Sequence, residues 1–209
     1  MINICVPVLK RYDLLRELVR SCQASNVQPD NYYIIDNGKN GHKILQALGD
    51  FDLAIKVHTP RVPMGITESW NWFIRRVPEE RVIVNDDITF EPGSLEALLA
   101  SKADLVWAKD CGFSCFMPRD ACVEKIGLFD EAISPGYGYY EDEDYLQRLD
   151  GRGTRAPSAV AETVDCGVQH HKSATLQAAS HVEILEHHRK FKIAQGNYAK
   201  KWALEEAFK

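Results

Sequence analysis

The chain has 209 residues, of which 45% are hydrophobic and 26% charged, and its formal net charge is −5. This length allows one large domain or two tightly fused halves, and the acidic balance disfavours a nucleic-acid backbone as the main partner. No apolar run approaches the roughly 18 residues that a membrane-spanning helix needs, so we expect no integral membrane segment.

The first half of the chain alternates apolar runs with segments of helical periodicity. The runs predict strands at 2–8, 32–35, 53–58, 82–84 and 104–108. Apolar residues at helical spacing predict helices at 12–25, 42–48, 64–77 and 94–101. Such alternation is typical of a parallel sheet with right-handed crossovers.

The rhythm changes after about residue 108. We predict strands at 113–117, 156–161 and 163–169, and helices at 119–126 and 141–149. A long polar helix is predicted from about residue 175 to 208, with a break near Gly196. Since neither a repeat nor a linker interrupts the chain, both halves are expected to share one continuous sheet.

The N-terminal segment and the cysteines both indicate in which cellular compartment the protein is expected. The N-terminus reads as a strand and not as a signal peptide, because it lacks a basic start and a long apolar core. The six cysteines lie in apolar contexts without a CxxC pair. We interpret them as reduced, buried thiols in a cytoplasmic protein.

One predicted strand ends abruptly in Asn85, Asp86 and Asp87. Open α/β sheets bind ligands at the carboxyl ends of their strands. Adjacent carboxylates repel one another unless a cation arrives, so a divalent ion carrying phosphates is the predicted guest. The alternative is a solvated acidic turn.

A second strand ends in Asp36, Asn37 and Gly38, and both strand ends are expected side by side over one crevice. Asp36 could accept hydrogen bonds from a base or ribose, while the same tripeptide also favours a turn. Neither GxGxxG nor GxxxxGK[ST] is present, which tells against a nicotinamide dehydrogenase and a P-loop nucleotide hydrolase. Phosphates bound here would therefore need a metal.

A second acidic cluster covers residues 141–144 and follows a loop that contains Tyr137, Tyr139 and Tyr140. Acids in a first helical turn complement the helix dipole, but four in a row exceed that need. We predict a catalytic role within the cluster, because a carboxylate near a metal-bound diphosphate could take a proton from an incoming hydroxyl. The tyrosines could present flat faces to a sugar. His170 and His171 end the last strand as possible metal ligands or as exposed polar surface.

These segments together resemble family 2 glycosyltransferases of the GT-A fold. The similarity covers, in order, the segments 6–15, 34–38, Gly65 with Asn71, 84–87, 117–120 with 126–131, 141–148, His170 with Ser173 and Thr175, and Tyr198 with 201–202. The expected fold is α/β, a Rossmann-like, mixed and mainly parallel sheet flanked by helices, with a C-terminal helical tail. It implies a single domain over 1–209, with a nucleotide-sugar half (1–108), an acceptor-binding and catalytic half (109–175) and a helical segment (176–209).

The resemblance also implies roles for individual residues. Asp142 would be the base that deprotonates the acceptor, and Asp87 would bind Mn²⁺ or Mg²⁺ together with His170 or His171. The implied substrate-binding residues are Pro7, Asp36, Arg61, Gly65, Asn71, Asn85, Asp86, Tyr139 and Glu141. The donor would be a nucleoside-diphosphate sugar, UDP-linked by expectation, and the acceptor a hydroxyl of a glycan, lipid, protein or modified base.

Two other interpretations stay open at this point. A nucleotidyltransferase of related fold would need a basic glycine-rich loop after the first strand, where residues 9–13 are basic but lack glycine. An inactive sugar-nucleotide or glycan-binding module would be expected to have lost acids, yet Asp36, Asp87 and Asp142 are all present.

Overall fold

The computed structural model describes residues 1–78, 80–152, 159–171, 177 and 179–203. Its central sheet has seven strands in the order β3-β2-β1-β4-β7-β6-β8. Their bounds are β1 Asn3–Val8, β2 Asn31–Asp36, β3 Ile55–His58, β4 Arg81–Val84, β6 Leu105–Ala108, β7 Cys115–Pro118 and β8 Ala161–Val164. Only β7 runs antiparallel to its neighbours, β4 and β6. The predicted continuous, mixed and mainly parallel sheet is confirmed.

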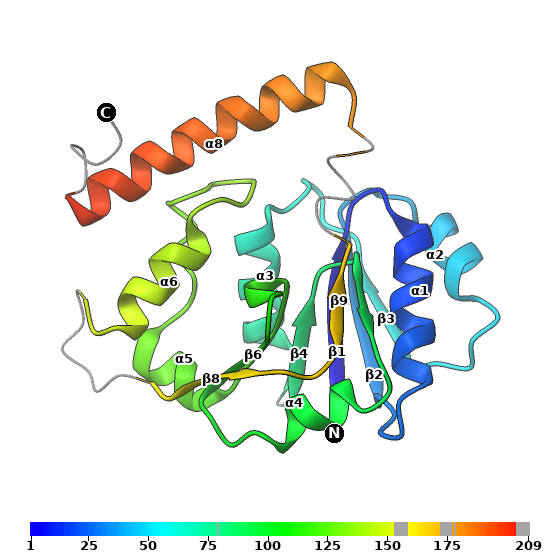
Figure 1. Cartoon of the computed structure of the whole chain (residues 1–209). Coiled ribbons are helices and arrows are strands. Elements are labelled where there is room, and N and C mark those ends of the chain that lie inside the picture. Colours follow the sequence, from blue (N-terminus) through cyan, green and yellow to red (C-terminus); the bar gives the residue numbers. More distant parts are fainter. Residues whose placement is uncertain (79, 153–158, 172–176, 178, 204–209) are drawn as a thin grey trace.

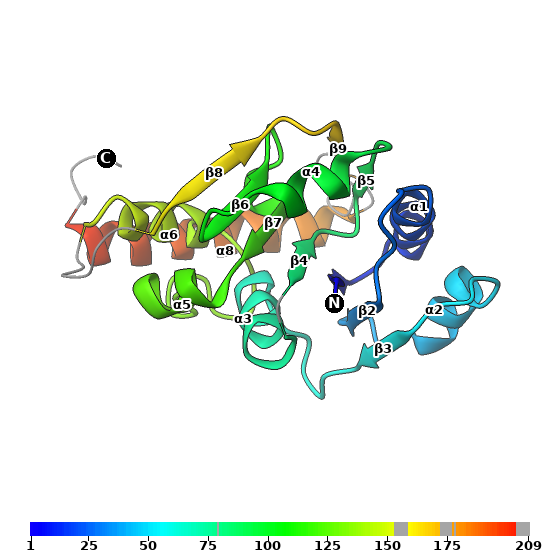
Figure 2. The same cartoon turned by 90° about the horizontal axis from the view of Figure 1, so that it is seen from below.

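Helices cover both faces of this sheet (Figures 1 and 2). Within β1, Val6 packs into the core on the side of α1 (Tyr12–Gln23), α2 (Gly41–Leu48) and α4 (Ser94–Ala100). Cys5 packs on the other side, with α3 (Ile66–Arg76), α5 (Asp120–Ile126) and α6 (Glu141–Leu149). Alternate residues of the strand are thus buried against opposite layers, which explains its continuous apolar run.

The strand predicted at 163–169 is in fact two strands. β8 belongs to the main sheet, whereas β9 (Val168–His170) pairs antiparallel with β5 (Ile88–Phe90) in a separate two-stranded sheet. Gly167 separates them with a φ of 69°, a left-handed backbone conformation that glycine adopts without steric cost. The strand predicted at 156–161 falls largely on 156–158, which lie outside the described residues.

The last helix, α8 (His181–Trp202), runs unbroken through Gly196, so the predicted break is wrong. A helix tolerates one glycine when packing holds it, and Ala194, Tyr198 and Ala199 are buried around this position. Figure 1 shows α8 lying across the ends of α6 and α3. In the described part of the chain, no helix combines the length and the apolar character that crossing a membrane requires.

One further boundary differs from the prediction. The strand expected at 113–117 begins at Cys115, because Gly112–Ser114 form the short 3-10 helix η1. All six cysteines are free thiols, and five of them are buried.

Candidate active site

The acids that follow β4 are buried at the centre of the sheet's carboxyl edge. Strand β1 lies between β2 and β4. The carboxyl ends of β2 and β4 therefore lie close together at the same edge of the sheet, as predicted. Asp86 and Asp87 are each 7% exposed, and Asn85 is half-buried. Burial, followed by the charge of Asp87, raises the pKa of Asp86 to about 7. Two carboxylates crowded together in this way favour a cation between or beside them.

Strand pairing brings His170 to this acidic group from more than eighty residues away. Ile88 of β5 lies opposite His170 of β9, so the imidazole comes beside the preceding residue, Asp87. The His170 Nε2 atom lies 3.2 Å from Asp87 Oδ1. His171 is exposed, and its backbone N–H donates to the Asp87 carbonyl oxygen at 2.9 Å. The geometry therefore favours His170 over His171 as a partner of Asp87.

The donor set at this place fits a hard divalent cation. Among the described residues, no cluster of three or more His, Cys, Asp or Glu side chains is arranged to hold a metal. One carboxylate and one imidazole, Asp87 and His170, do lie within reach of a common ion. Mg²⁺ and Mn²⁺ commonly take one or two protein ligands and complete their coordination with water and substrate phosphates. The site fits that pattern.

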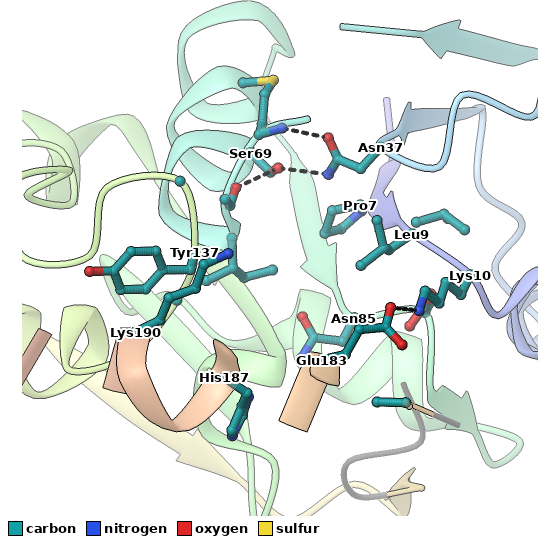
Figure 3. Close-up of a pocket in the computed structure, with 18 of the residues that line it drawn as sticks. Pro7, Leu9, Lys10, Asn37, Ser69, Asn85, Tyr137, Glu183, His187 and Lys190 are labelled. Carbon is teal, nitrogen blue, oxygen red and sulfur yellow. Dashed lines mark hydrogen bonds and ion pairs between the residues drawn. The ribbon is translucent and has the colours of Figure 1, made fainter. Parts of the chain in front are cut away.

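A cavity of about 750 Å³ opens over the acids, and we call it the first cavity (Figure 3). Seven of the predicted site residues line it: Pro7, Gly65, Asn85, Asp86, Asp87, Tyr139 and His170. Asp36 does not line it. Asp36 is fully buried, and its Oδ1 accepts a hydrogen bond from Tyr12 at 2.8 Å. The neighbouring Asn37 lines the cavity instead, held by Ser69 and by the backbone N–H of Met64.

Gly65 allows the loop of residues 136–138 to approach the start of α3. A Cβ atom at Gly65 would lie only 2.3 Å from the Tyr137 nitrogen and 2.5 Å from its carbonyl oxygen. No side chain fits there, so the glycine brings Tyr137 against the cavity wall. Glycine at this position is thus required by a close backbone approach.

Besides Asp36, two predicted substrate-binding residues lie outside both cavities. Asn71 is fully buried, and its amide exchanges hydrogen bonds with the Phe129 backbone and donates to Glu131. The structure therefore gives Asn71 a role in packing α3 against residues 129–131, in place of the expected substrate contact. Arg61 is exposed, and its carbonyl oxygen accepts from Lys39.

A second cavity of about 640 Å³ adjoins the first, and it contains Asp142. The two cavities share four lining residues: Ile66, Asn85, Gly138 and Tyr139. Glu141 and Asp142 come from the first turn of α6, and Tyr140, the N-cap residue before this helix, has a φ of 63°. A non-glycine residue held in the left-handed region is strained, and Tyr140 is held there by packing against Tyr198 and Phe191. Both predicted acids thus line one wall of the second cavity.

The carboxyls of this wall differ in environment. Glu141 is buried and accepts from the Ser134 hydroxyl at 3.3 Å. Burial and then the charge of Asp142 raise the pKa of Glu141 to about 8, so this carboxyl is mainly protonated at pH 7. Burial, reinforced by Asp142, also raises the pKa of Glu143 to about 8. Asp142 is half-buried beside these two acids, and its Oδ1 accepts a hydrogen bond from the Glu143 backbone N–H at 3.0 Å.

Helix α8 closes one side of both cavities, which the sequence did not predict. Glu183 forms an ion pair with Lys10, and the His187 ring forms a hydrogen bond with Tyr139. Lys190 lies over the ring of Tyr137, 5.5 Å from its centroid. Figure 3 shows these α8 side chains facing Pro7 and Leu9 across the first cavity. Their only sequence signal was a long helix rich in polar residues, which is typical of a solvated surface as well.

The C-terminal residues that resemble the family differ in what the structure describes of them. Ser173 and Thr175 lie outside the described residues. Lys201 and Trp202 both contact Asp144, a fully buried acid of α6. The Lys201 Nζ atom is 2.6 Å from Asp144 Oδ1, and the Trp202 indole N–H donates to the same oxygen at 3.0 Å. These contacts fasten the end of α8 to α6.

Comparison with known families gives one match. Residues 3–105, about half of the chain, match the family described as glycosyl transferase family 2. The matched part holds β1 to β4, including the acids at residues 85–87. A search of the curated proteins returned no match.

Solved structures with the same fold include S. aureus TarS 1–349 (TM-score 0.58, 14% identity, 78% of this chain and 57% of that chain). Another is the mannosyltransferase PcManGT from Pyrobaculum calidifontis in complex with GDP-Man and Mn²⁺ (TM-score 0.59, 12% identity, 79% and 56%). A third is S. aureus TarS 1–349 in complex with UDP-GlcNAc (TM-score 0.55, 16% identity, 83% and 61%). The chain spans less than two thirds of these structures.

Proposed function

This chain belongs to glycosyl transferase family 2, and from that premise we propose that it transfers a sugar from a nucleoside-diphosphate sugar to an acceptor hydroxyl. One observation carries the proposal. The Asp87–His170 pair in the first cavity and Asp142 in the second cavity lie on either side of a shared wall that contains Asn85 and Tyr139. A leaving group and an attacking hydroxyl can therefore approach one sugar carbon from two sides.

The donor would occupy the first cavity. Asp87 and His170 would hold Mn²⁺ or Mg²⁺, and the chemistry such an ion supplies is neutralisation of charge on the departing diphosphate. Asn85 and Asp86 would lie toward the ribose. Structures of the same fold hold UDP-GlcNAc in one case and GDP-Man with Mn²⁺ in another, which supports a nucleotide sugar as the donor. We propose a UDP-linked sugar.

Base recognition would fall to the end of β2. The buried Asp36 has one carboxylate oxygen, Oδ2, without a partner among the described residues. Access to it requires the Tyr12 side chain to move, because Tyr12 holds the other oxygen. Asn37 lines the cavity already and offers an amide beside it.

The acceptor would enter the second cavity, where Asp142 serves as the general base. As the acceptor oxygen forms its bond to the anomeric carbon, Asp142 takes the hydroxyl proton, and the bond from that carbon to the diphosphate breaks. Attack from the side opposite the leaving group inverts the configuration of the carbon. Asp142 lines the second cavity and is half-buried, so its carboxyl group is accessible to an acceptor hydroxyl.

The direct test is to incubate the chain with UDP- and GDP-sugars and Mn²⁺, and to follow release of the nucleoside diphosphate. We expect release with a UDP-sugar and its loss in an Asp87→Ala variant. The matched control is Asp52→Ala, an exposed acid that lines neither cavity. Absence of turnover and binding for every nucleotide sugar, with an unchanged Asp87→Ala variant, would contradict the proposal.

A further inference from the structure

The second cavity has a wall of aromatic side chains contributed by elements far apart in the sequence. These side chains are Trp70, Trp107, Phe113, Tyr139, Tyr140 and Phe191. They come from α3, β6, η1, the loop before α6, and α8. Aromatic faces pack against the C–H faces of sugar rings as well as against other apolar groups, so this wall alone admits several kinds of acceptor.

The ionisable side chains of the second cavity restrict the acceptor more than the aromatic wall does. Its lining includes Glu141, Asp142 and Glu143, and among the described lining residues none is Lys, Arg or His. The first cavity, in contrast, contains basic side chains beside its acids: it is lined by Lys10, His170, His187 and Lys190 together with Asp86, Asp87, Glu183 and Glu186. Burial and the charge of Asp142 already keep Glu141 mainly protonated, so the second cavity disfavours a further negative charge, and a phosphate or carboxylate is disfavoured there.

Two polar atoms at this cavity lack a hydrogen-bond partner among the described residues. Trp70 is only 3% exposed, and its Nε1–H donor is unsatisfied. Asn85 donates to Ser114 through Nδ2 at 3.1 Å, but its Oδ1 acceptor is unsatisfied. Buried polar groups are normally paired, so both atoms point to a ligand. Hydroxyl groups can accept from Trp70 Nε1–H and donate to Asn85 Oδ1, whereas an alkyl chain can do neither.

We propose that the second cavity takes a saccharide acceptor whose reacting unit is uncharged or carries an amino group, and that it rejects acceptors with a phosphate or carboxylate on that unit. The inference rests on the proposed function, and it narrows the acceptor from any hydroxyl to one chemical class. Sugars that are phosphorylated, carboxylated or linked directly to a lipid phosphate are excluded at this cavity. The aromatic wall, the unbalanced acids and the unpaired donor and acceptor all support the same class.

The test measures binding of four small probes to the whole chain by saturation-transfer NMR, without a donor. The probes are methyl glucoside, methyl glucosaminide, glucose 6-phosphate and glucuronate. We expect the first two to bind at least tenfold more tightly than the last two. Equal or tighter binding of the anionic probes, or no binding of the neutral ones, overturns the inference.

Variants locate the effect in the cavity. Trp107→Ala is expected to weaken binding of both favoured probes, because this half-buried side chain forms part of the wall. Glu143→Lys replaces an acid of the cavity by a base. We expect it to lower the ratio of the Kd for glucose 6-phosphate to the Kd for methyl glucoside at least threefold. Its control is Glu124→Lys, the same charge reversal on an exposed residue of α5 that lines neither cavity. A Glu143→Lys variant that folds normally and keeps the parent preference overturns the inference.

The assay separates this inference from the proposed function, since no nucleotide sugar is present. If neutral saccharides bind as expected but no nucleotide sugar is turned over, the proposed function fails alone. If nucleotide sugars are turned over but anionic sugars accept equally well, the acceptor assignment fails alone.

Discussion

At the scale of single residues, the site contains several acids that differ in burial and in pKa. Asp86 and Glu141 are buried beside another carboxylate, and both have a raised pKa. Asp87 pairs with His170, while Asp142 stays half-buried at a cavity wall. Similar side chains are thereby assigned to different tasks, since burial favours the neutral form of an acid and solvent access favours the ion.

The first prediction at this scale concerns Asp142. Replacement by Asn keeps the size of the side chain but removes the base, so we expect transfer to fall about 10²- to 10⁴-fold. Binding of the nucleotide should be retained, because Asp142 does not line the first cavity. Rates and nucleotide affinity are to be measured on the same preparation. Equal loss of both would instead indicate that α6 had been disrupted.

The second prediction concerns the pH dependence of stability through Glu141. Its pKa rises from 4.5 to about 8 on folding, so the folded state binds the proton more tightly. The resulting stability is fully present below pH 4.5 and is lost as the pH rises to about 8. A Glu141→Gln variant mimics the protonated form and should gain stability over the parent across this window.

Urea unfolding of parent and variant at pH 5 and pH 8 checks this expectation. Glu124→Gln, at an exposed position, serves as the control and should follow the parent at both values. A difference between Glu141→Gln and the parent that does not grow with pH would show that the carboxyl is ionised in the folded protein.

At the scale of elements, α8 is the helix that completes the site. Its first half supplies Glu183, His187 and Lys190 to the first cavity, and its second half is fastened to the buried Asp144. Few of its residues are buried, so its position depends on these polar and aromatic contacts more than on a large apolar face. The element that encloses both cavities is therefore also one of the less deeply packed parts of the fold.

The prediction at this scale concerns Gly196, an exposed residue inside α8. A Cβ atom there would have nothing within 4 Å, and its φ is not in the left-handed region. Gly196→Ala should therefore stabilise the protein by about 0.5–1 kcal/mol and raise Tm by about 1–4 °C. The matched control is Gly167→Ala, which should destabilise it by about 1–2 kcal/mol, because its φ is 69°.

Calorimetry of both variants tests this prediction. A lower Tm for Gly196→Ala would contradict the prediction, because it would show that a side chain at this position disturbs the packing of α8.

At the scale of the whole molecule, the sheet order decides where two substrates can meet. β1 has β2 on one side and β4 on the other, so the chain reverses direction across the sheet between them. The first cavity opens at this switch point, the place where open α/β sheets bind ligands. The second cavity lies beyond β4, where β7 and β6 extend the sheet and the 3-10 helix η1 lines the cavity.

A prediction at this scale links ligand binding to global stability. If UDP and Mn²⁺ bind together to the folded chain, their presence at 100 times Kd should stabilise it by about 2.7 kcal/mol. For a chain of this length, the expected rise in Tm is about 5–10 °C. Chelation of the metal with EDTA should abolish most of the shift from UDP. A shift from UDP that is unaffected by EDTA would contradict the role given to Asp87 and His170.

The sequence by itself determined the sheet, most helices and the acids at residues 85–87. These features are local: an apolar run, a helical period and a cluster of like charges each indicate their structure within about ten residues. The same local signals failed at the boundary of β8 and β9 and at Gly196, where pairing with β5 and packing around Tyr198 decided the outcome.

Only the tertiary structure decided which side chains meet. The choice of His170 over His171 follows from its register with Ile88, and the enclosure of both cavities follows from the position of α8. Asn71 belongs to a segment that resembles the family, and its side-chain amide donates hydrogen bonds to the Phe129 carbonyl oxygen and to Glu131. Such contacts join residues 50–80 positions apart or more, and no spacing along one chain encodes them. The composition of each cavity, and hence the acceptor it favours, is a property of the folded molecule.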